Sequence, residues 1–268
     1  MKNIDIKEAH KLLLEIAKEI HIICKNHNIP YYILGGTMLG AIRHNGFIPW
    51  DDDMDFGIPR EYYNKFIELC NKEFPPHLQI QTIDNSDYVI LCFAKVSDLR
   101  TIAYEKFAIN ATQDIGINID VFPLDHTNYK KSIFSFNWYI RTVFRLQKLL
   151  FMNAETRSTN LRILARILQA INPLQKKTIP NYLTNILLKR IRNKDKYNVY
   201  ANYFGGWGLK ELTPKNVFGT PKLYKFEDTE LYGANDYDQY LTLLYNNYMQ
   251  LPPENKRHIH HNNVFWKE

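Results

Sequence analysis

The architecture of this chain is most readable between residues 31 and 58, where the sequence is YYILGGTMLGAIRHNGFIPWDDDMDFGI. Residues 31–34 have the composition of a buried strand and lead directly into Gly35-Gly36, after which residues 37–42 are expected to form a short helix. A second strand is expected at residues 54–58, where Pro59 ends it. Strand, glycine turn, helix and strand therefore follow one another within this stretch.

The flanking sequence continues the alternation of helix and strand. Asp5 is placed to cap an amphipathic helix, with Glu8 three residues later as in a capping box, and apolar residues recur at helical spacing until residues 26–28. Residues 61–73 also have a helical period, and further strands are expected at residues 78–83, 88–96 and 115–122. The sequence therefore predicts an α+β fold with a mixed sheet and flanking helices.

Length and composition bound the class of protein. The chain has 268 residues, of which 45% are apolar, enough to fill the core of one large domain or of a compact core with a helical appendage. The three cysteines Cys24, Cys70 and Cys92 are odd in number and widely spaced, so they are expected to be buried apolar residues. The first residues lack the apolar stretch of a signal peptide, which predicts a cytoplasmic location.

Positive charge is concentrated in one middle segment. Residues 130–196 contain 15 Lys and Arg against two acids, a net charge of +13 that leaves −7 for the rest of the +6 chain. Large apolar residues lie between these basic ones, which predicts a basic helical insertion at 129–197 that contacts an anionic membrane at the inner face of the cell. The predicted plan is a catalytic core at 1–128, this insertion, and a segment at 198–268 that returns to the core.

The charge pattern also excludes some functions. Arg141, Arg145 and Lys148 interrupt every window long enough to span a bilayer, so a spanning role is excluded. Basic and aromatic residues together also suit nucleic acid, but no RNP, KH or helix-turn-helix pattern accompanies them. No nucleic-acid partner is expected.

The acidic run carries the chemistry. On an extended strand Asp53 and Asp55 project from one face while Met54 and Phe56 point into the core. Asp51 continues this alternation, whereas Asp52 is expected to point elsewhere.

A fourth acid completes the expected site. Asp120 lies amid apolar residues on a later strand, where burial requires a cationic partner. Carboxylate oxygens suit Mg²⁺, and Mn²⁺ would serve as a substitute. The sequence therefore predicts a metal site of Asp51, Asp53, Asp55 and Asp120.

The glycine turn supplies the anion-binding half of the site. Backbone N–H groups of Gly35 and Gly36 and the Thr37 hydroxyl are expected to cradle phosphate oxygens at the start of the following helix. Arg43 and His44 follow within reach of the same anion.

Several residues admit a structural interpretation beside the functional one. The acidic run alone fits a solvated turn, and Arg43 with His44 fits a helix end at the surface. The others, with their two interpretations, are Asp125 (active-site acid or turn cap), Trp50 (nucleobase stacking or packing), Lys95 (phosphate contact or solvated strand end) and the histidines His258, His260 and His261 (zinc ligands or a solvated terminus).

These residues resemble a known family. Residues 35–55, GGTMLGAIRHNGFIPWDDDMD, closely resemble the signature of the LicD family, and residues 119–125, IDVFPLD, look like its second block. Residues 248–257 and the pair His260-His261 look like its last block. Two positions depart from the pattern: Tyr245-Asn246 replaces the usual Tyr-Gly, and the proline that usually follows the pair Phe226-Glu227 is missing.

The resemblance implies a nucleotidyltransferase-like fold and a function. Members move a phospho-alcohol such as phosphocholine from a CDP-linked donor to a hydroxyl of a cell-surface glycan: lipopolysaccharide, teichoic acid or capsule. Members resembling fukutin-related protein use ribitol phosphate instead. Asp51, Asp53 and Asp55 match the family's acidic motif, and Asp120 matches its later acid.

The expected reaction is an in-line displacement. Mg²⁺ held by Asp53, Asp55 and Asp120 would bridge the donor diphosphate, a sugar hydroxyl would attack, and CMP would leave, with a carboxylate such as Asp120 accepting the proton. Two alternatives stay open. One is a nucleotidyltransferase that uses an NTP on a small acceptor, and the other is a non-catalytic protein that binds membranes or glycans.

Overall fold

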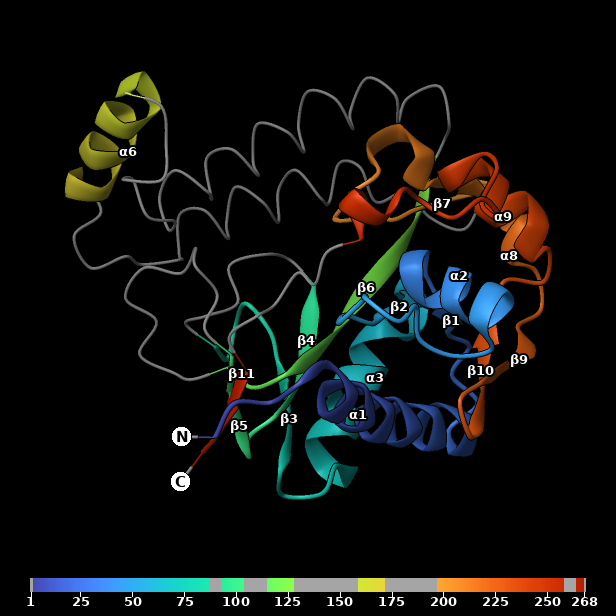
Figure 1. Cartoon of the computed structure of the whole chain (residues 1–268), viewed down its shortest axis with the longest axis horizontal. Coiled ribbons are helices and arrows are strands. Elements are labelled where there is room, and N and C mark those ends of the chain that lie inside the picture. The colour runs from blue at the N-terminus through green and yellow to red at the C-terminus, as the bar shows by residue number, and fades with distance from the viewer. Residues whose placement is uncertain are drawn as a thin grey trace.

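The computed structural model describes residues 2–86, 93–103, 115–127, 159–171, 197–257 and 264–267. Within these ranges the chain has an α+β architecture, as predicted (Figure 1). The helices are α1 (Ile6–Asn26), α2 (Gly35–His44), α3 (Arg60–Glu73), α6 (Thr159–Ile171), α8 (Lys215–Phe218), α9 (Tyr237–Tyr245) and the 3-10 helices η3 (Gly208–Glu211) and η4 (Glu254–Lys256). The division into three sequence segments stays a prediction.

A curled mixed sheet forms the centre of the molecule. In the described part of the chain it has seven strands, with the order β1-β2-β6-β4-β3 and with β7 and β8 added beside the far end of β6. β2 and β6 are parallel and the other pairs are antiparallel. The strands are β1 (Tyr32–Ile33), β2 (Asp55–Pro59), β3 (Leu78–Gln81), β4 (Ala94–Asp98), β6 (Asn118–Thr127), β7 (Val199–Ala201) and β8 (Leu212–Pro214).

Two small antiparallel pairs flank this sheet. β9 (Lys222–Phe226) pairs with β10 (Thr229–Gly233), which contacts β1. β5 (Thr101–Ala103) pairs with β11 (Val264–Trp266), and Asn3 bridges Phe265. The two ends of the chain therefore lie side by side (Figure 1).

Helices α1 and α3 cover one face of the sheet and contact each other (Figure 1). The predicted cap of α1 is confirmed, because the Asp5 carboxylate accepts the backbone N–H of Glu8 at 2.9 Å. The apolar stripe of α1, including Leu13, Ile16 and Ile20, is fully buried. This stripe fixes the helix against the sheet, since non-directional apolar burial needs only the correct period.

The strand boundaries differ from the prediction where turns intervene. The first strand is shorter because Leu34 already caps α2, which begins at Gly35 rather than at residue 37. The strand after residue 78 ends at Gln81, since the Asn85 side chain closes a turn on the Thr82 backbone at 2.6 Å. The strand predicted at 115–122 begins at Asn118 and runs on to Thr127, because its end pairs with β7.

Burial follows the predicted alternation. Met54, just before β2, and Phe56 within it are at most 1% exposed, as expected for inward positions. Cys24 and Cys70 are free and buried, which confirms their structural interpretation, while Cys92 lies outside the described residues.

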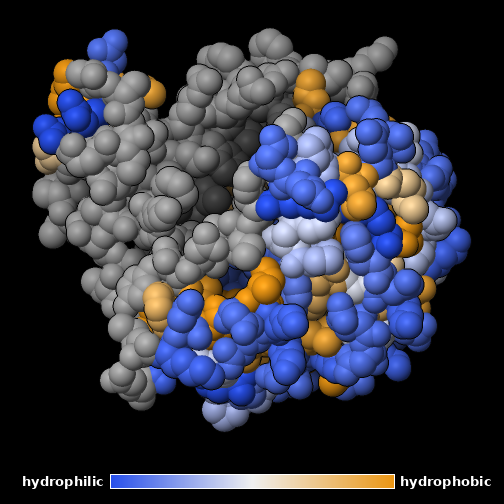
Figure 2. Space-filling view, in the orientation of Figure 1, coloured by the Kyte–Doolittle hydropathy of each residue, from blue (hydrophilic) through white to orange (hydrophobic). Residues whose placement is uncertain are grey.

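The basic middle segment is described only over α6. Leu161, Ile163, Leu164 and Ile167 on this helix are 44–54% exposed, and hydrophobic and hydrophilic residues lie side by side on it (Figure 2). No helix in the described ranges is long and apolar enough to cross a bilayer. Contact between residues 130–196 and a membrane stays a prediction.

Candidate active site

The parallel pairing of β2 and β6 brings the predicted acids together. Asp55 lies directly opposite Asp120 in the register of the two strands, and Asp53 lies just before β2. The Asp120 N–H donates to the Met54 carbonyl at 3.1 Å, which fixes the register at this point. Residues 65 positions apart in the sequence thus become neighbours at one edge of the sheet.

The electrostatic state of Asp55 shows how close these acids are. Burial raises the pKa of the Asp55 carboxyl well above its usual value, and the neighbouring carboxylates of Asp53 and Asp120 raise it further. No ion pair to Asp53 or Asp55 is found within the described residues. Ionising the whole group is therefore unfavourable unless a cation binds there.

A divalent ion is a suitable cation for this group. No three carboxylate, imidazole or thiolate groups of the described residues converge as a complete metal cage. Mg²⁺ does not require one, because it commonly binds one or two carboxylates and takes its remaining ligands from phosphates and water. The donor set of Asp53, Asp55 and Asp120 fits that mode of binding.

Lys95 lies inside the site, with partners that the sequence did not identify. Its ammonium contacts the Asp120 carboxylate at 2.6 Å and the Asn118 amide oxygen at 3.0 Å. The side chain is 15% exposed, so the expectation of a solvated strand end is wrong. Antiparallel pairing of β4 with β6 places Lys95 opposite Asp120, and only this register reveals the cationic partner of this partly buried acid.

Asp51 is held over the first turn of α2. The Asp51 carbonyl oxygen lies 2.6 Å from Nε2 of His10. A Cβ atom at Gly36 would lie only 2.7 Å from Oδ2 of Asp51, so glycine is needed there for close approach.

Asp52 follows the expected alternation in burial. Asp52, Met54 and Phe56 are buried, whereas Asp51, Asp53 and Asp55 are partly exposed. The Asp52 residue is 7% exposed and lines the same cavity as Asp53 and Asp120. The period of two in burial therefore extends from residue 51 into β2, which begins at Asp55.

The glycine turn is built as predicted but is partly used by the fold itself. The Gly35 N–H donates to the Tyr240 hydroxyl at 3.0 Å, and the Thr37 hydroxyl accepts the Asp55 N–H at 2.9 Å. Gly35 has a positive φ of 48°, a conformation that favours glycine. Thr37 therefore positions the acidic strand, and phosphate binding at this turn stays a prediction.

Arg43 and His44 connect α2 to the C-terminal segment. Arg43 donates to the Tyr248 carbonyl at 3.0 Å and to Nε2 of His44 at 3.0 Å. Burial lowers the pKa of both side chains, and the neighbouring Arg43 guanidinium lowers that of His44 further.

Trp50 packs edge-on against His44, and the Arg257 guanidinium lies 4.9 Å from the centroid of the Trp50 ring. Trp50 therefore packs against these two residues, and nucleobase stacking by Trp50 stays a prediction.

Asp125 has a structural partner. Its side chain is 1% exposed and forms a two-pronged ion pair with Arg60, at 2.8 Å and 3.0 Å. Asp125 lies within β6, so the interpretation as a turn cap is wrong. The histidines His258, His260 and His261 lie outside the described residues.

The C-terminal segment adds groups that sequence reasoning did not identify. Glu211, Tyr240 and Trp207 line a cavity of about 50 Å³ together with Asp55 and Gly35. Burial raises the pKa of Glu211 to about 7, opposed by hydrogen bonds from the Trp207 N–H and the Asn202 side chain. No spacing in the sequence signals this contact, because η3 reaches β2 only through the tertiary fold.

The raised pKa of Glu211 predicts a dependence of stability on pH. The folded carboxyl titrates near 7 and the unfolded one near 4.5, so the folded state binds more protons between these values. The free energy of unfolding should therefore fall as the pH rises through this window. Replacing Glu211 with Gln is expected to stabilise the protein by about 2–3 kcal/mol at pH 8 and to have little effect at pH 5.

Urea denaturation at the two pH values measures this difference. The exposed Glu68→Gln variant is the matched control and should show no such gain at pH 8. An equal effect of Glu211→Gln at both pH values would show that burial of the carboxyl does not cause it.

Comparison with known proteins agrees with this geometry. The family described as LicD/FKTN/FKRP, nucleotidyltransferase domain, matches residues 28–158, which contain the glycine turn, the acidic run and Asp120. The chain belongs to the LicD family. As a member it is an enzyme, a LicD-type transferase.

Two relatives show how far the similarity extends. The lipopolysaccharide cholinephosphotransferase LicD of Haemophilus influenzae is 28% identical over 270 residues, which cover 97% of both chains. The human ribitol 5-phosphate transferase FKRP is 40% identical over 48 residues, which are 18% of this chain and 10% of that protein. The similarity between this chain and the Haemophilus influenzae protein therefore includes the C-terminal segment that carries Glu211 and Tyr240.

Proposed function

We propose that this chain transfers phosphocholine from CDP-choline to a hydroxyl of a cell-surface glycan in a reaction that depends on Mg²⁺. The observation that carries the proposal is the pairing of Asp55 with Asp120 on parallel strands, with Asp53 beside them. The similarity to a lipopolysaccharide cholinephosphotransferase over nearly the whole chain supports phosphocholine and a lipopolysaccharide-type acceptor, with teichoic acid and capsule as further candidates. The core would then be nucleotidyltransferase-like, in line with the family's description.

The residues of the site would divide the work as follows. Asp53, Asp55 and Asp120 would hold Mg²⁺, with Asp51 beside them, and the ion would neutralise the charge of the donor diphosphate. The N–H of Gly36 and the side chains of Arg43 and His44 would orient the phosphates.

The displacement needs one proton acceptor. The acceptor hydroxyl would attack the phosphorus that carries choline, the bond from that phosphorus to the CMP oxygen would break, and CMP would leave. Asp120 would accept the hydroxyl proton, since a carboxylate at the reacting centre can act as a general base.

Release of CMP tests this function directly. We expect the purified protein with Mg²⁺ to release CMP from CDP-choline faster than from CDP-glycerol or CDP-ribitol, and to lose this activity in EDTA. Mn²⁺ should restore part of it. Addition of lipopolysaccharide should raise the rate, since an acceptor hydroxyl would then replace water.

The two alternatives give different products. Pyrophosphate released from an NTP, without CMP from any CDP-alcohol, would replace the proposal with nucleotidyl transfer. Salt-sensitive binding to anionic vesicles without turnover of any CDP-alcohol would indicate a binding protein instead.

A further inference from the structure

A cavity opens beside the acidic group and has a different character on its far side. Its volume is about 350 Å³, within the range of small-molecule pockets. At one end it is lined by Asp53, Asp120 and Lys95, which belong to the active site. The described residues of the rest of its wall are Asn3, Ile4, Asp5, Ile6, Ala9, Asp52, Met54, Ala103, Ile117, Asn118 and Val264.

The two ends of the chain build the far wall of this cavity. The Ile4 N–H donates to the Val264 carbonyl at 2.9 Å, and Val264 pairs with Ala103 across β11 and β5. Hydrophobic residues gather in this region of the visible face (Figure 2). The wall is therefore a product of tertiary pairing between segments that are far apart in the sequence.

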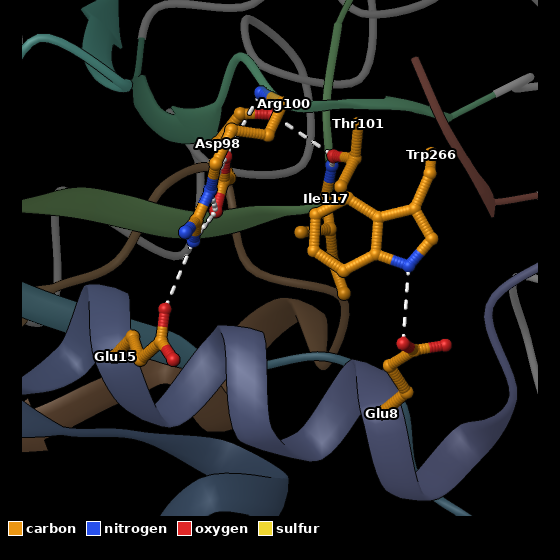
Figure 3. A network of polar contacts seen from close by, with 7 residues as sticks. All are labelled: Glu8, Glu15, Asp98, Arg100, Thr101, Ile117 and Trp266. Atoms are coloured by element: carbon orange, nitrogen blue, oxygen red, sulfur yellow. Dashed lines mark hydrogen bonds and ion pairs between the residues drawn. The ribbon is translucent and has the colours of Figure 1, made fainter. Parts of the chain in front are cut away.

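Hydrogen bonds hold this wall in place against α1 and the sheet (Figure 3). The Trp266 indole donates to Glu8 at 3.1 Å, which ties β11 to α1. The Thr101 hydroxyl donates to the Asp98 carbonyl at 2.9 Å and accepts the Ile117 N–H at 2.8 Å. Arg100 pairs with Asp98 and, at 2.9 Å, with Glu15. The cavity is thus a built feature whose shape is fixed on several sides.

The wall combines carboxylates with aliphatic side chains. Asp5 and Asp52 contribute negative charge outside the metal-binding group, and Asp52 is 7% exposed. Ile4, Ala9, Ile117 and Val264 are buried apolar residues around them. A ligand that suits this wall is positively charged and has an apolar surface.

We infer that this cavity binds the quaternary ammonium end of the donor alcohol, with Asp52 as the residue that selects a cation. The inference rests on the proposed function, because the phosphate of the same donor would lie at Asp53 and Asp120. A trimethylammonium group has no N–H to donate, so it needs charge and methyl contact rather than directed hydrogen bonds. Aromatic cages often serve this purpose. Here carboxylate charge and aliphatic contact would replace them, since no aromatic ring lies in the described lining.

The other parts of the reaction suit this cavity less well. A diphosphate would meet the Asp5 and Asp52 carboxylates, and placing like charges together is unfavourable. A neutral polyol would leave hydroxyl groups unpaired against Ile4, Ile117 and Val264. A quaternary ammonium group is therefore the part of the donor that this wall recognises best.

Asp52→Asn is the variant that isolates charge from shape. We expect it to lower kcat/KM for CDP-choline relative to CDP-glycerol by about tenfold, since one carboxylate beside a partly desolvated cation is lost. Calorimetric titration in the presence of Mg²⁺ should show that the variant has lost about tenfold in affinity for phosphocholine and nothing in affinity for glycerol 3-phosphate. Asp84→Asn, in an exposed turn after β3, is the matched control. It should leave the ratio of the two kcat/KM values and the affinities for both phosphate ligands unchanged.

A second variant tests the apolar wall without touching a charge. Ala103→Phe adds bulk at the strand that faces the cavity, and we expect it to weaken phosphocholine binding by about tenfold or more. An equal effect of Asp52→Asn on both phosphate ligands, or full phosphocholine binding by Ala103→Phe, would overturn the inference. So would a wild-type protein that binds glycerol 3-phosphate as tightly as phosphocholine. Absence of CMP release from every CDP-alcohol would instead remove the proposed function, and the binding comparison would still test the cavity.

Discussion

Replacing Asp55 with Asn is expected to lower the rate of CMP release from CDP-choline by about a thousandfold, which corresponds to about 4 kcal/mol. Asp55 lies opposite Asp120 on the neighbouring parallel strand, so an amide there weakens the binding of a divalent ion at the centre of the group. The measurement is the initial rate at saturating Mg²⁺, together with the Mg²⁺ concentration that gives half of the maximal rate.

Stability separates this effect from loss of the fold. Burial and the neighbouring carboxylates raise the pKa of Asp55, so its charge is unfavourable in the metal-free protein. The metal-free Asp55→Asn variant should therefore unfold at the same temperature as the wild type or at a higher one. Full Mg²⁺-dependent activity in this variant would remove Asp55 from the proposed metal site, whereas exposed Asp228→Asn should be fully active.

The second large effect is expected at Asp125. Its carboxylate is 1% exposed and meets the Arg60 guanidinium in a two-pronged pair, at 2.8 Å and 3.0 Å. Asp125→Ala would leave the arginine, itself only 19% exposed, without this partner, and we expect the free energy of unfolding to fall by about 3–5 kcal/mol. Urea denaturation monitored by tryptophan fluorescence gives the value.

A double variant shows whether the loss comes from the pair. Asp125→Ala combined with Arg60→Met should be more stable than Asp125→Ala alone, because the unpaired cation is then removed. A loss below about 1 kcal/mol for Asp125→Ala would mean that water solvates Arg60 well enough to replace the carboxylate.

Patterns of short range were predicted well because their physics is local. The Asp5 cap and the apolar stripe of α1 depend only on residues within a few helical turns, and both are present as expected. The glycine pair at the start of α2 also follows from local sequence, although the helix begins two residues earlier than predicted. The alternation through the acidic run is also present in burial, since Asp52, Met54 and Phe56 are buried and Asp51, Asp53 and Asp55 are partly exposed.

Contacts between distant segments had no such local signal. The position of Asp120 amid apolar residues in the sequence implied a cation, but only the antiparallel register of β4 and β6 identifies Lys95 as that cation. Glu211 and Tyr240 reach Asp55 and Gly35 from the C-terminal segment. No spacing of residues in the sequence predicts these contacts. Residue types and order were thus visible, while their partners were not.

The acidic site, the glycine pair and the strand that carries Asp120 could all be predicted from the sequence, because each depends on only a few neighbouring residues. The sequence by itself also determined the family, through the same residues. Only the tertiary structure decided that Asp55 and Asp120 lie opposite each other, that Lys95 pairs with one of them, and that the chain ends wall a cavity beside Asp52. The reason is physical: strand register and the docking of chain ends depend on the packing of the whole core, which no local pattern encodes.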